Sequence, residues 1–215
     1  MGFCVPLIVQ SLELYRFSKF SLSLLQITNS MNFTETDIKG LWIIEPCKFE
    51  DARGYFMESY KQSEFERHIG TIHFIQDNES QSSFGVLRGF HFQTGDTAQA
   101  KLVRVVRGNV WDLAVDIRND SPSFGNYFAL ELSEENNKQI FIPRGFAHGF
   151  LVLSETAVFQ YKVDNVYSPA TEQTIHCLDP DLNISWPLPS HQLILSEKDK
   201  LGKSLKELIR VNTNF

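Results

Sequence analysis

Residues 101–118 have the sequence "KLVRVVRGNVWDLAVDIR", in which two runs rich in valine and other apolar residues flank the tripeptide "RGN", Arg107–Asn109. This composition predicts two strands joined by a tight turn as a β-hairpin. Similar runs, each bounded by turn residues, follow on both sides: "GVLRGFHFQ" (85–93), "YFALELS" (127–133), "KQIFIP" (138–143), "GFLVLS" (149–154) and "AVFQYKV" (157–163). Many short strands with turn residues between them are typical of a β-sandwich or β-barrel.

Two segments depart from this strand pattern and favour helix. In "SEFERHIG", residues 63–70, Ser63 and Glu66 have the spacing of a capping box, and Gly70 suits the end of the helix. In "SEKDKLGKSLKELIRV", residues 196–211, the leucines are spaced as one helical face. We therefore expect an all-β fold with a few short helices.

The composition is that of an ordinary globular protein and excludes some partners. The chain has 215 residues, of which 42% are hydrophobic and 21% charged, so it is long enough to bury a substantial core. A net charge of -6 argues against a broad nucleic-acid-binding face, although it leaves room for a local basic pocket that binds one diphosphate. We expect no nucleic-acid partner.

The first thirty residues differ from the rest. Their two apolar runs are broken by Glu13, Arg16 and Lys19, so neither approaches the roughly 18–20 residues that span a bilayer. We expect residues 1–30 to be an extension outside the fold, with an ordered arm or a targeting segment as alternatives, and residues 31–215 to form a single domain. The scattered cysteines Cys4, Cys47 and Cys177 show no metal or disulfide spacing, which favours a reducing, cytoplasmic location without membrane contact.

Strand alternation directs several polar side chains inward. Lys101 shares a strand face with Val103 and Val105, and Tyr161 shares one with Phe159 and Val163. Each has a simple structural explanation, because a buried tyrosine often bonds through its hydroxyl and a lysine at a strand end can reach water. His148, among apolar residues, can equally be a hydrogen-bonded core histidine.

Arg88 and His91 are three residues apart, which puts them on opposite faces of a regular strand. A bulge at Gly89 would bring both to one side. Asp199 follows Ser196 by three residues and so fits a helix capping box. Singly these residues have structural explanations, but two histidines, a lysine and a tyrosine in one small β-core each need a partner, which favours a site.

The motif "PRGFAHGF", residues 143–150, places Pro143, Gly145 and His148 in a P-x-G-x-x-H spacing that resembles the second motif of the cupin superfamily. Metal-binding cupins add an H-x-H pair and an acidic ligand, whereas this chain has Gln93 after His91 and has Lys101 in the acidic region. Two imidazoles beside an ammonium make an incomplete and repulsive metal shell. We therefore expect a cupin-type jelly roll without a metal and without another cofactor.

The same residues suit proton transfer next to a ketone. That chemistry needs a base, a group that stabilises the enolate oxygen and an acid that returns the proton. A neutral imidazole, a buried ammonium and a tyrosine can fill these roles. Return of the proton to the opposite face inverts the carbon, so the set predicts an epimerase.

From about residue 31 to residue 201, the chain resembles the dTDP-4-dehydrorhamnose 3,5-epimerase family of nucleotide-sugar metabolism. The family's motifs occur in its order and approximate spacing: "FEDARGYFMESY", "FIQDN", "GVLRGFHFQ", "AQAKLVRVVRGNVWDLAVDIRNDSPSFG", "FIPRGFAHGFLVLSE", "YKVDNVYSPATE", "LDPDLNISWP" and "LSEKD". The resemblance implies conversion of dTDP-4-dehydro-6-deoxy-D-glucose into dTDP-4-dehydro-L-rhamnose, in dTDP-L-rhamnose biosynthesis. It also implies a homodimer of jelly rolls that exchange N-terminal strands.

The resemblance further implies roles for individual residues. The catalytic positions are the base His91, the carboxylate Asp199 that orients it, the proton donor Tyr161, and Lys101 near the ketone. The substrate-binding positions are Arg53, Glu58, Gln76, Asn78, Arg88, His148, Glu172, Lys198 and Tyr167, of which Tyr167 stacks on the thymine. Arg53 and Glu58 would enter the site of the neighbouring protomer.

Three other functions stay open at this stage. A relative that inverts only C3 shares nearly every motif. A metal-dependent cupin oxygenase and a sugar-binding cupin without catalysis are the other two, and the second would leave Tyr161 and the His91–Asp199 pair without a purpose. Asp164 and Val166 replace a threonine and an aromatic residue that are frequent beside Tyr167 in the family, which leaves the nucleotide less certain than the chemistry.

Overall fold

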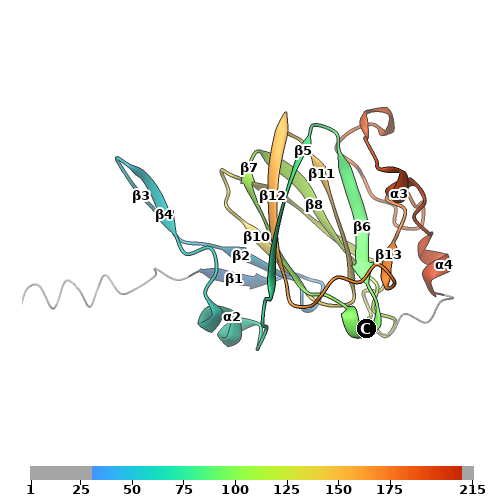
Figure 1. Ribbon diagram of the computed structural model, residues 1–215, viewed down its shortest axis with the longest axis horizontal. Helices are drawn as coiled ribbons and strands as arrows, with labels where there is room; N and C mark the ends of the chain where they lie inside the picture. Colours follow the sequence, from blue (N-terminus) through green and yellow to red (C-terminus); the bar gives the residue numbers. More distant parts are fainter. Residues whose placement is uncertain (1–30, 210–215) are drawn as a thin grey trace, which may run out of the picture.

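Two antiparallel β-sheets face each other in the computed structural model, which describes residues 31–209 (Figure 1). The six-stranded sheet has the order β1 (Asn32–Glu35), β2 (Trp42–Glu45), β10 (Gln139–Ile142), β7 (Lys101–Arg107), β12 (Thr156–Val163), β5 (Gln76–Ser83). The five-stranded sheet has the order β13 (Glu172–Thr174), β6 (Leu87–Gln93), β11 (Phe146–Val152), β8 (Asn109–Asp116), β9 (Tyr127–Ser133). The all-β, jelly-roll prediction is confirmed.

The remaining elements are short. Strands β3 (Lys48–Asp51) and β4 (Gly54–Met57) form a separate hairpin that extends away from the two sheets (Figure 1). The helices are α2 (Gln62–His68), η1 (Gly95–Thr97), η2 (Ser190–Gln192), α3 (Glu197–Lys200) and α4 (Leu205–Ile209). In the part of the chain from residue 31 to 209, no helix has the length and apolarity needed to cross a membrane.

The predicted hairpin at residues 101–118 is wrong in one respect. Both strands and the turn form, but β7 belongs to the six-stranded sheet and β8 to the five-stranded sheet. Val103 of β7 and Ala114 of β8 are both buried in the core cluster between the sheets. The apolar faces of the two strands therefore meet across the sandwich, and the turn carries the chain from one sheet to the other.

Gly108 makes this crossing possible. Its φ is +72°, and a Cβ on it would lie 2.2 Å from the carbonyl oxygen of Thr156. A side chain at this position would collide with backbone, so the turn requires glycine.

The core between the two sheets is built from aromatic and aliphatic side chains. Phe150 of β11 and Phe159 of β12 stack with ring centroids 4.2 Å apart, which joins the two sheets directly. Two further clusters cover the outer faces: Phe65 of α2 packs with Leu102 behind the six-stranded sheet, and Leu205 of α4 packs with Leu113 behind the five-stranded sheet. Burial of such aromatic and aliphatic side chains supplies most of the stabilisation of a fold of this kind.

The helix predictions are partly confirmed. Helix α2 forms and ends at His68, two residues before Gly70 (φ +119°). The capping box does not form, because Lys61 is the N-cap residue and makes no side-chain capping bond. The C-terminal segment breaks into α3 and α4. Between them the Lys203 amide bonds to the carbonyl of Thr174, which holds this stretch against the sheet and leaves Leu201 83% exposed.

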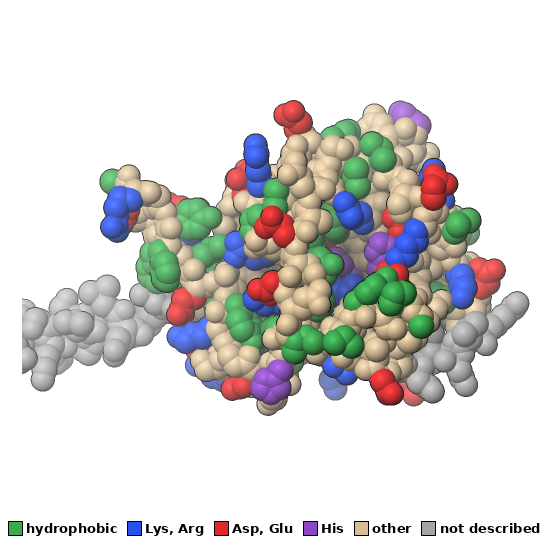
Figure 2. Space-filling view, viewed as in Figure 1, with side chains coloured by type: hydrophobic (Ala, Val, Ile, Leu, Met, Phe, Trp, Pro, Cys, Tyr) green, Lys and Arg blue, Asp and Glu red, His purple; other side chains and the backbone are tan. Residues whose placement is uncertain are grey.

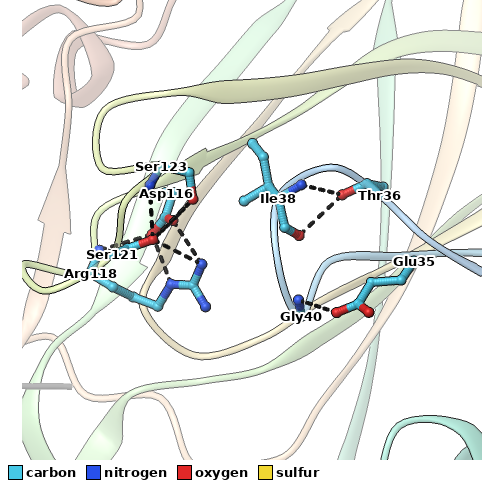
Figure 3. A network of polar contacts seen from close by, with 8 residues as sticks. All are labelled: Glu35, Thr36, Ile38, Gly40, Asp116, Arg118, Ser121 and Ser123. Carbon is cyan, nitrogen blue, oxygen red and sulfur yellow. Dashed lines mark hydrogen bonds and ion pairs between the residues drawn. The ribbon is translucent and has the colours of Figure 1, made fainter.

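A buried carboxylate fixes the end of β8. Asp116 is fully buried and accepts hydrogen bonds from the Arg118 side chain, at 2.8 and 2.7 Å, and from the hydroxyls of Ser121 and Ser123, at 2.5 and 2.6 Å (Figure 3). Burial alone would raise the pKa of Asp116, but these hydrogen bonds outweigh it and lower the pKa. The loop after β8 is therefore anchored to the end of β8, the same strand that carries a second buried aspartate, Asp112.

Candidate active site

A bulge in β6 brings Arg88 and His91 to the same face. His91 lies opposite His148 of β11 and Arg88 lies opposite Phe150, so three steps along β6 match two along β11. Because His148 and Phe150 share the inner face of β11, their partners share it too. The predicted bulge at Gly89 is confirmed. Figure 2 shows histidine side chains beside Lys and Arg side chains in a hollow between β5 and β6.

Gly89 is required for this geometry. Its φ is +127°, and a Cβ on it would lie 2.5 Å from the Cα of Gly149 on the neighbouring strand. The two backbones approach so closely that neither position has room for a side chain. Gly89 and Gly149 therefore shape the strand that carries His91.

His91 contacts a buried carboxylate from the C-terminal part of the chain. Its Nε2 lies 2.5 Å from Oδ1 of Asp199, which is 3% exposed and lies on α3. The Ser196 hydroxyl donates to Oδ2 of Asp199 at 2.8 Å and accepts from the Asp199 amide at 3.1 Å. Asp199 therefore both takes part in the helix cap and pairs with the histidine.

The charge state of Asp199 follows from these contacts. Burial raises its pKa, but the hydrogen bonds from His91 and Ser196 lower it by more, so the pKa lies below its ordinary value. Asp199 is then ionised at neutral pH. An ionised carboxylate orients the imidazole and stabilises the imidazolium that forms when the ring takes a proton.

His148 forms a second pair, with Asp112 of β8. Its Nε2 lies 2.9 Å from Oδ2 of Asp112, and both side chains are buried. Burial lowers the pKa of His148, and the carboxylate offsets only part of that effect, so this imidazole is neutral at neutral pH. The other oxygen of Asp112, Oδ1, has no hydrogen-bond partner within residues 31–209.

Sequence reasoning did not identify Asp112, although the sequence carries a signal for it. Asp112 alternates with Val110 and Ala114, and both of those lie in the core between the sheets. A carboxylate on an apolar strand face is costly unless it has a partner. The same alternation that indicated Lys101 therefore indicates Asp112.

Lys101 lies beside both histidine pairs. Its Nζ donates to the backbone carbonyl of His91 at 3.3 Å. Burial lowers the pKa of Lys101 to about 8, even though Asp112 and Glu172 lie close enough to raise it. Its ammonium is thus charged at neutral pH and poorly solvated, a state in which it interacts strongly with a nearby oxyanion.

Tyr161 approaches from the opposite sheet. It lies on the inner face of β12, between Asn78 of β5 and Val103 of β7. Burial raises the pKa of Tyr161, Arg88 lowers it and Glu172 raises it, with a net increase, so the hydroxyl keeps its proton at neutral pH. His91 and Tyr161 therefore belong to opposite walls of one site.

The predicted substrate-binding residues form two groups around these walls. Arg88 donates to the Ser82 hydroxyl at 3.0 Å, and Gln76 donates to Asn78 at 2.7 Å on the same inner face of β5. On the other side, Glu172 accepts from the Tyr167 hydroxyl at 2.8 Å and pairs with Lys198 at 2.5 Å. Burial raises the pKa of Glu172, but these two contacts lower it by more.

Arg53 and Glu58 are not brought to this site within the chain. Arg53 lies at the turn of the β3–β4 hairpin, where its 89% exposed side chain pairs with Asp51, and Glu58 pairs with Lys61 just after the hairpin. The hairpin extends away from the sheets that carry His91 and Tyr161 (Figure 1). Phe49, Tyr55 and Phe56 on it are 40%, 56% and 66% exposed.

The donor set does not fit a metal of the cupin type. Within the described residues, 31–209, no group of three or more His, Cys, Asp or Glu side chains is placed to hold an ion. Gln93, where a second histidine would be needed, uses its side-chain oxygen to accept hydrogen bonds from Ser168 and Thr171. Lys101 also places a cation next to His91.

Comparison with known proteins identifies the family. Residues 35–207 match the family model described as dTDP-4-dehydrorhamnose 3,5-epimerase. The enzyme of that name from Escherichia coli K12 is 51% identical over 182 residues, which cover 84% of this chain and 98% of that protein. The structure of the Elizabethkingia anophelis NUHP1 enzyme of that name is 52% identical, with a TM-score of 0.80 over 83% of this chain and 98% of that one. A dTDP-6-deoxy-D-glucose-3,5-epimerase from Legionella pneumophila, solved with dTDP-4-keto-L-rhamnose, is 47% identical, with a TM-score of 0.82 over 86% and 98%.

Proposed function

The chain belongs to the dTDP-4-dehydrorhamnose 3,5-epimerase family, and from this premise we propose that it inverts C3 and C5 of dTDP-4-dehydro-6-deoxy-D-glucose, which gives dTDP-4-dehydro-L-rhamnose. The observation that carries the proposal is the pair of opposite walls, with His91 and the ionised Asp199 on one and Tyr161 on the other. Lys101 lies beside His91. No cofactor takes part in the proposed chemistry.

The reaction at each carbon consists of two proton transfers. His91 takes the proton from the carbon next to the ketone, and the electrons of that C–H bond move to the C4 oxygen as an enolate. The Lys101 ammonium stabilises this oxygen. Tyr161 then returns a proton to the opposite face, the enolate collapses to the ketone, and the carbon is inverted.

The other residues hold the nucleotide and the diphosphate. Arg88 is well shaped for a diphosphate, because its guanidinium bonds two oxygens at once. Gln76 and Asn78 extend the same wall. Tyr167, 52% exposed, offers a ring on which a thymine can stack, while Glu172 and Lys198 complete that side.

The N-terminal hairpin of one protomer completes the site of another in a homodimer. Its exposed apolar side chains support this proposal, because such patches mark surfaces that bind other chains. A hollow of about 280 Å³ on the outer face of the six-stranded sheet, lined by residues that include Leu102 and Arg104, offers a further surface for contact. Arg53 and Glu58 then reach a site that their own chain does not give them.

The enzyme works in the cytoplasm, in dTDP-L-rhamnose biosynthesis. The nucleotide-sugar substrate and the scattered cysteines support this location. Residues 31–215 act as one domain and residues 1–30 take no part in the reaction, a proposal supported by the family match over residues 35–207.

Product analysis tests this function. Purified protein with dTDP-4-dehydro-6-deoxy-D-glucose should give the product inverted at both carbons, with an undiminished rate after treatment with a chelator. Inversion at C3 alone would establish the C3-only reaction instead. Loss of activity on chelation would contradict the cofactor-free mechanism, and tight binding without turnover would make the protein a binding module.

A further inference from the structure

The segment that follows β12, residues 164–172, carries Tyr167 and Glu172 and has no regular structure until β13 begins at Glu172. Side-chain hydrogen bonds hold its first residues. Oδ1 of Asp164 accepts from the Ala100 amide at 2.7 Å, and Asn165 donates to the carbonyl of Asp96 at 2.7 Å. At its other end, Glu172 enters the β6–β13 ladder opposite Gln93. The middle, around Tyr167 and Ser168, needs its own support.

Gln93 gives that support from inside the sandwich. Its side chain is 6% exposed, and its Oε1 accepts from the Ser168 amide at 2.9 Å and from the Thr171 hydroxyl at 3.0 Å. Ser168 directly follows Tyr167 in the chain. One buried oxygen thus holds the backbone next to Tyr167, the residue proposed to stack on the thymine.

Gln93 also lies two residues after His91, on the same face of β6. Gln93 is therefore part of the strand that carries the catalytic base His91, and its side-chain amide contacts the segment that carries Tyr167. The His91–Asp199 pair and Lys101 have hydrogen-bond partners of their own.

We propose that Gln93 is a positioning residue, which holds residues 164–172 at a fixed place relative to His91 so that Tyr167 and Glu172 meet the nucleotide sugar while His91 meets its carbon. This inference rests on the proposed function and adds a residue to it. In a cupin of the metal-binding type the same position would carry a ligand. Here its amide holds the substrate-binding segment.

Replacement of Gln93 by leucine, which has a similar size and no acceptor, tests the proposal. The variant loses two hydrogen bonds at the middle of the segment while both ends stay attached. We expect KM for the nucleotide sugar to rise about tenfold and kcat to change less than about twofold, because uniform binding is lost and the proton-transfer groups are untouched. The Kd for dTDP, measured by calorimetry, should rise by a similar factor.

A double-mutant cycle with Tyr167→Ala separates positioning from general damage. If Gln93 acts through this segment, Gln93→Leu should raise KM by less than about twofold when it is introduced into the Tyr167→Ala variant. Full additivity, an unchanged KM, or a fall in kcat as large as the rise in KM would each overturn the proposal.

Two further variants complete the design. Ser154→Ala is the matched control. The Ser154 hydroxyl also accepts a hydrogen bond from a backbone amide, that of Asn109 at 2.9 Å, but it does so at the turn between β7 and β8. Ser154→Ala should lower thermal stability and leave KM unchanged. If Gln93→Leu does not fold, Thr171→Val removes the hydroxyl that donates to Gln93, together with its contacts to Thr97 and to the Ser168 carbonyl, and should raise KM about threefold. A wild-type protein that shows no epimerisation would refute the function alone, because the dTDP affinities would still test the positioning.

Discussion

The histidines of the site, His91 and His148, each contact a buried carboxylate, yet their surroundings differ. Hydrogen bonds from His91 and Ser196 lower the pKa of Asp199, whereas the second oxygen of Asp112 has no hydrogen-bond partner among residues 31–209. Burial keeps His148 neutral. The first pair is suited to take a proton, whereas burial makes His148 a weaker base that Asp112 holds in place.

Replacement of Asp199 by asparagine tests the first pair. The amide keeps the size of the side chain but removes the negative charge that orients the imidazole and stabilises the imidazolium. We expect kcat to fall about 10²-fold or more with KM nearly unchanged, measured as initial rates on the nucleotide sugar. Ser196→Ala, which removes only the hydroxyl, should cost far less. An Asp199→Asn variant within threefold of wild type would show that the pair is structural.

The pH dependence of the rate reports on Lys101. Its pKa is lowered to about 8, so the ammonium is present below that pH and is lost as the pH rises through it. Activity should therefore fall on the alkaline side with a midpoint near pH 8. In Lys101→Arg the guanidinium stays charged, so this alkaline limb should move beyond pH 10 even if the rate is lower throughout. An alkaline midpoint that stays near 8 in Lys101→Arg would assign it to another group.

At the scale of elements, the site depends on how β6 and β11 pack against each other. The bulge at Gly89 turns Arg88 and His91 to one face, and the close approach to Gly149 leaves no room for a side chain. The energetic cost of a side chain there is steric and cannot relax by a rotamer change, because the atom it meets is backbone.

Replacement of Gly89 by alanine should therefore reduce both stability and activity. We expect the free energy of unfolding to fall by about 3 kcal/mol, from urea titration, and activity to fall more than tenfold. Gly70→Ala is the matched control, since its φ of +119° is close to the +127° of Gly89 but a Cβ there meets nothing within 4 Å. Gly70→Ala should lower the free energy of unfolding by about 1 kcal/mol and leave activity unchanged. Equal effects of both substitutions would attribute the loss to backbone conformation alone.

The elements also show what the sequence can and cannot predict. Alternation placed Lys101 and Tyr161 on inner faces, and Gly89 indicated the bulge, because these features depend on a few neighbouring residues. The partner of β7 could not be predicted, because its inward valines fit equally well into a hairpin or a sandwich. The break between α3 and α4 depends on a bond from Lys203 to Thr174, which no local pattern reveals.

At the scale of the whole molecule, the site combines segments that are distant in sequence. The His91–Asp199 contact joins residues 108 positions apart, and neither residue indicates the other by its local pattern. The resemblance to a known family predicts this pair, which strand and helix patterns alone do not. Arg53 and Glu58 lie on or just after the β3–β4 hairpin, and the fold of a single chain does not bring them to His91.

Complementation between two variants tests the exchange of hairpins. Arg53→Ala and His91→Ala should each be nearly inactive as homodimers. After they are unfolded together and refolded as a mixture, half of the dimers should carry one intact site, so activity should recover to about a quarter of the wild-type value. Refolding each variant alone should recover none. If the mixture also stays inactive, Arg53 does not act in the neighbour's site.

The central claim is that His91 removes, and Tyr161 returns, the protons at C3 and C5. The most direct measurement is NMR of dTDP-4-dehydro-6-deoxy-D-glucose with the purified protein in D₂O. We predict that deuterium enters both carbons, that His91→Ala stops this exchange, and that Tyr161→Phe allows exchange but slows the formation of inverted product. Full exchange in His91→Ala, or inverted product that carries no solvent deuterium, would contradict the mechanism.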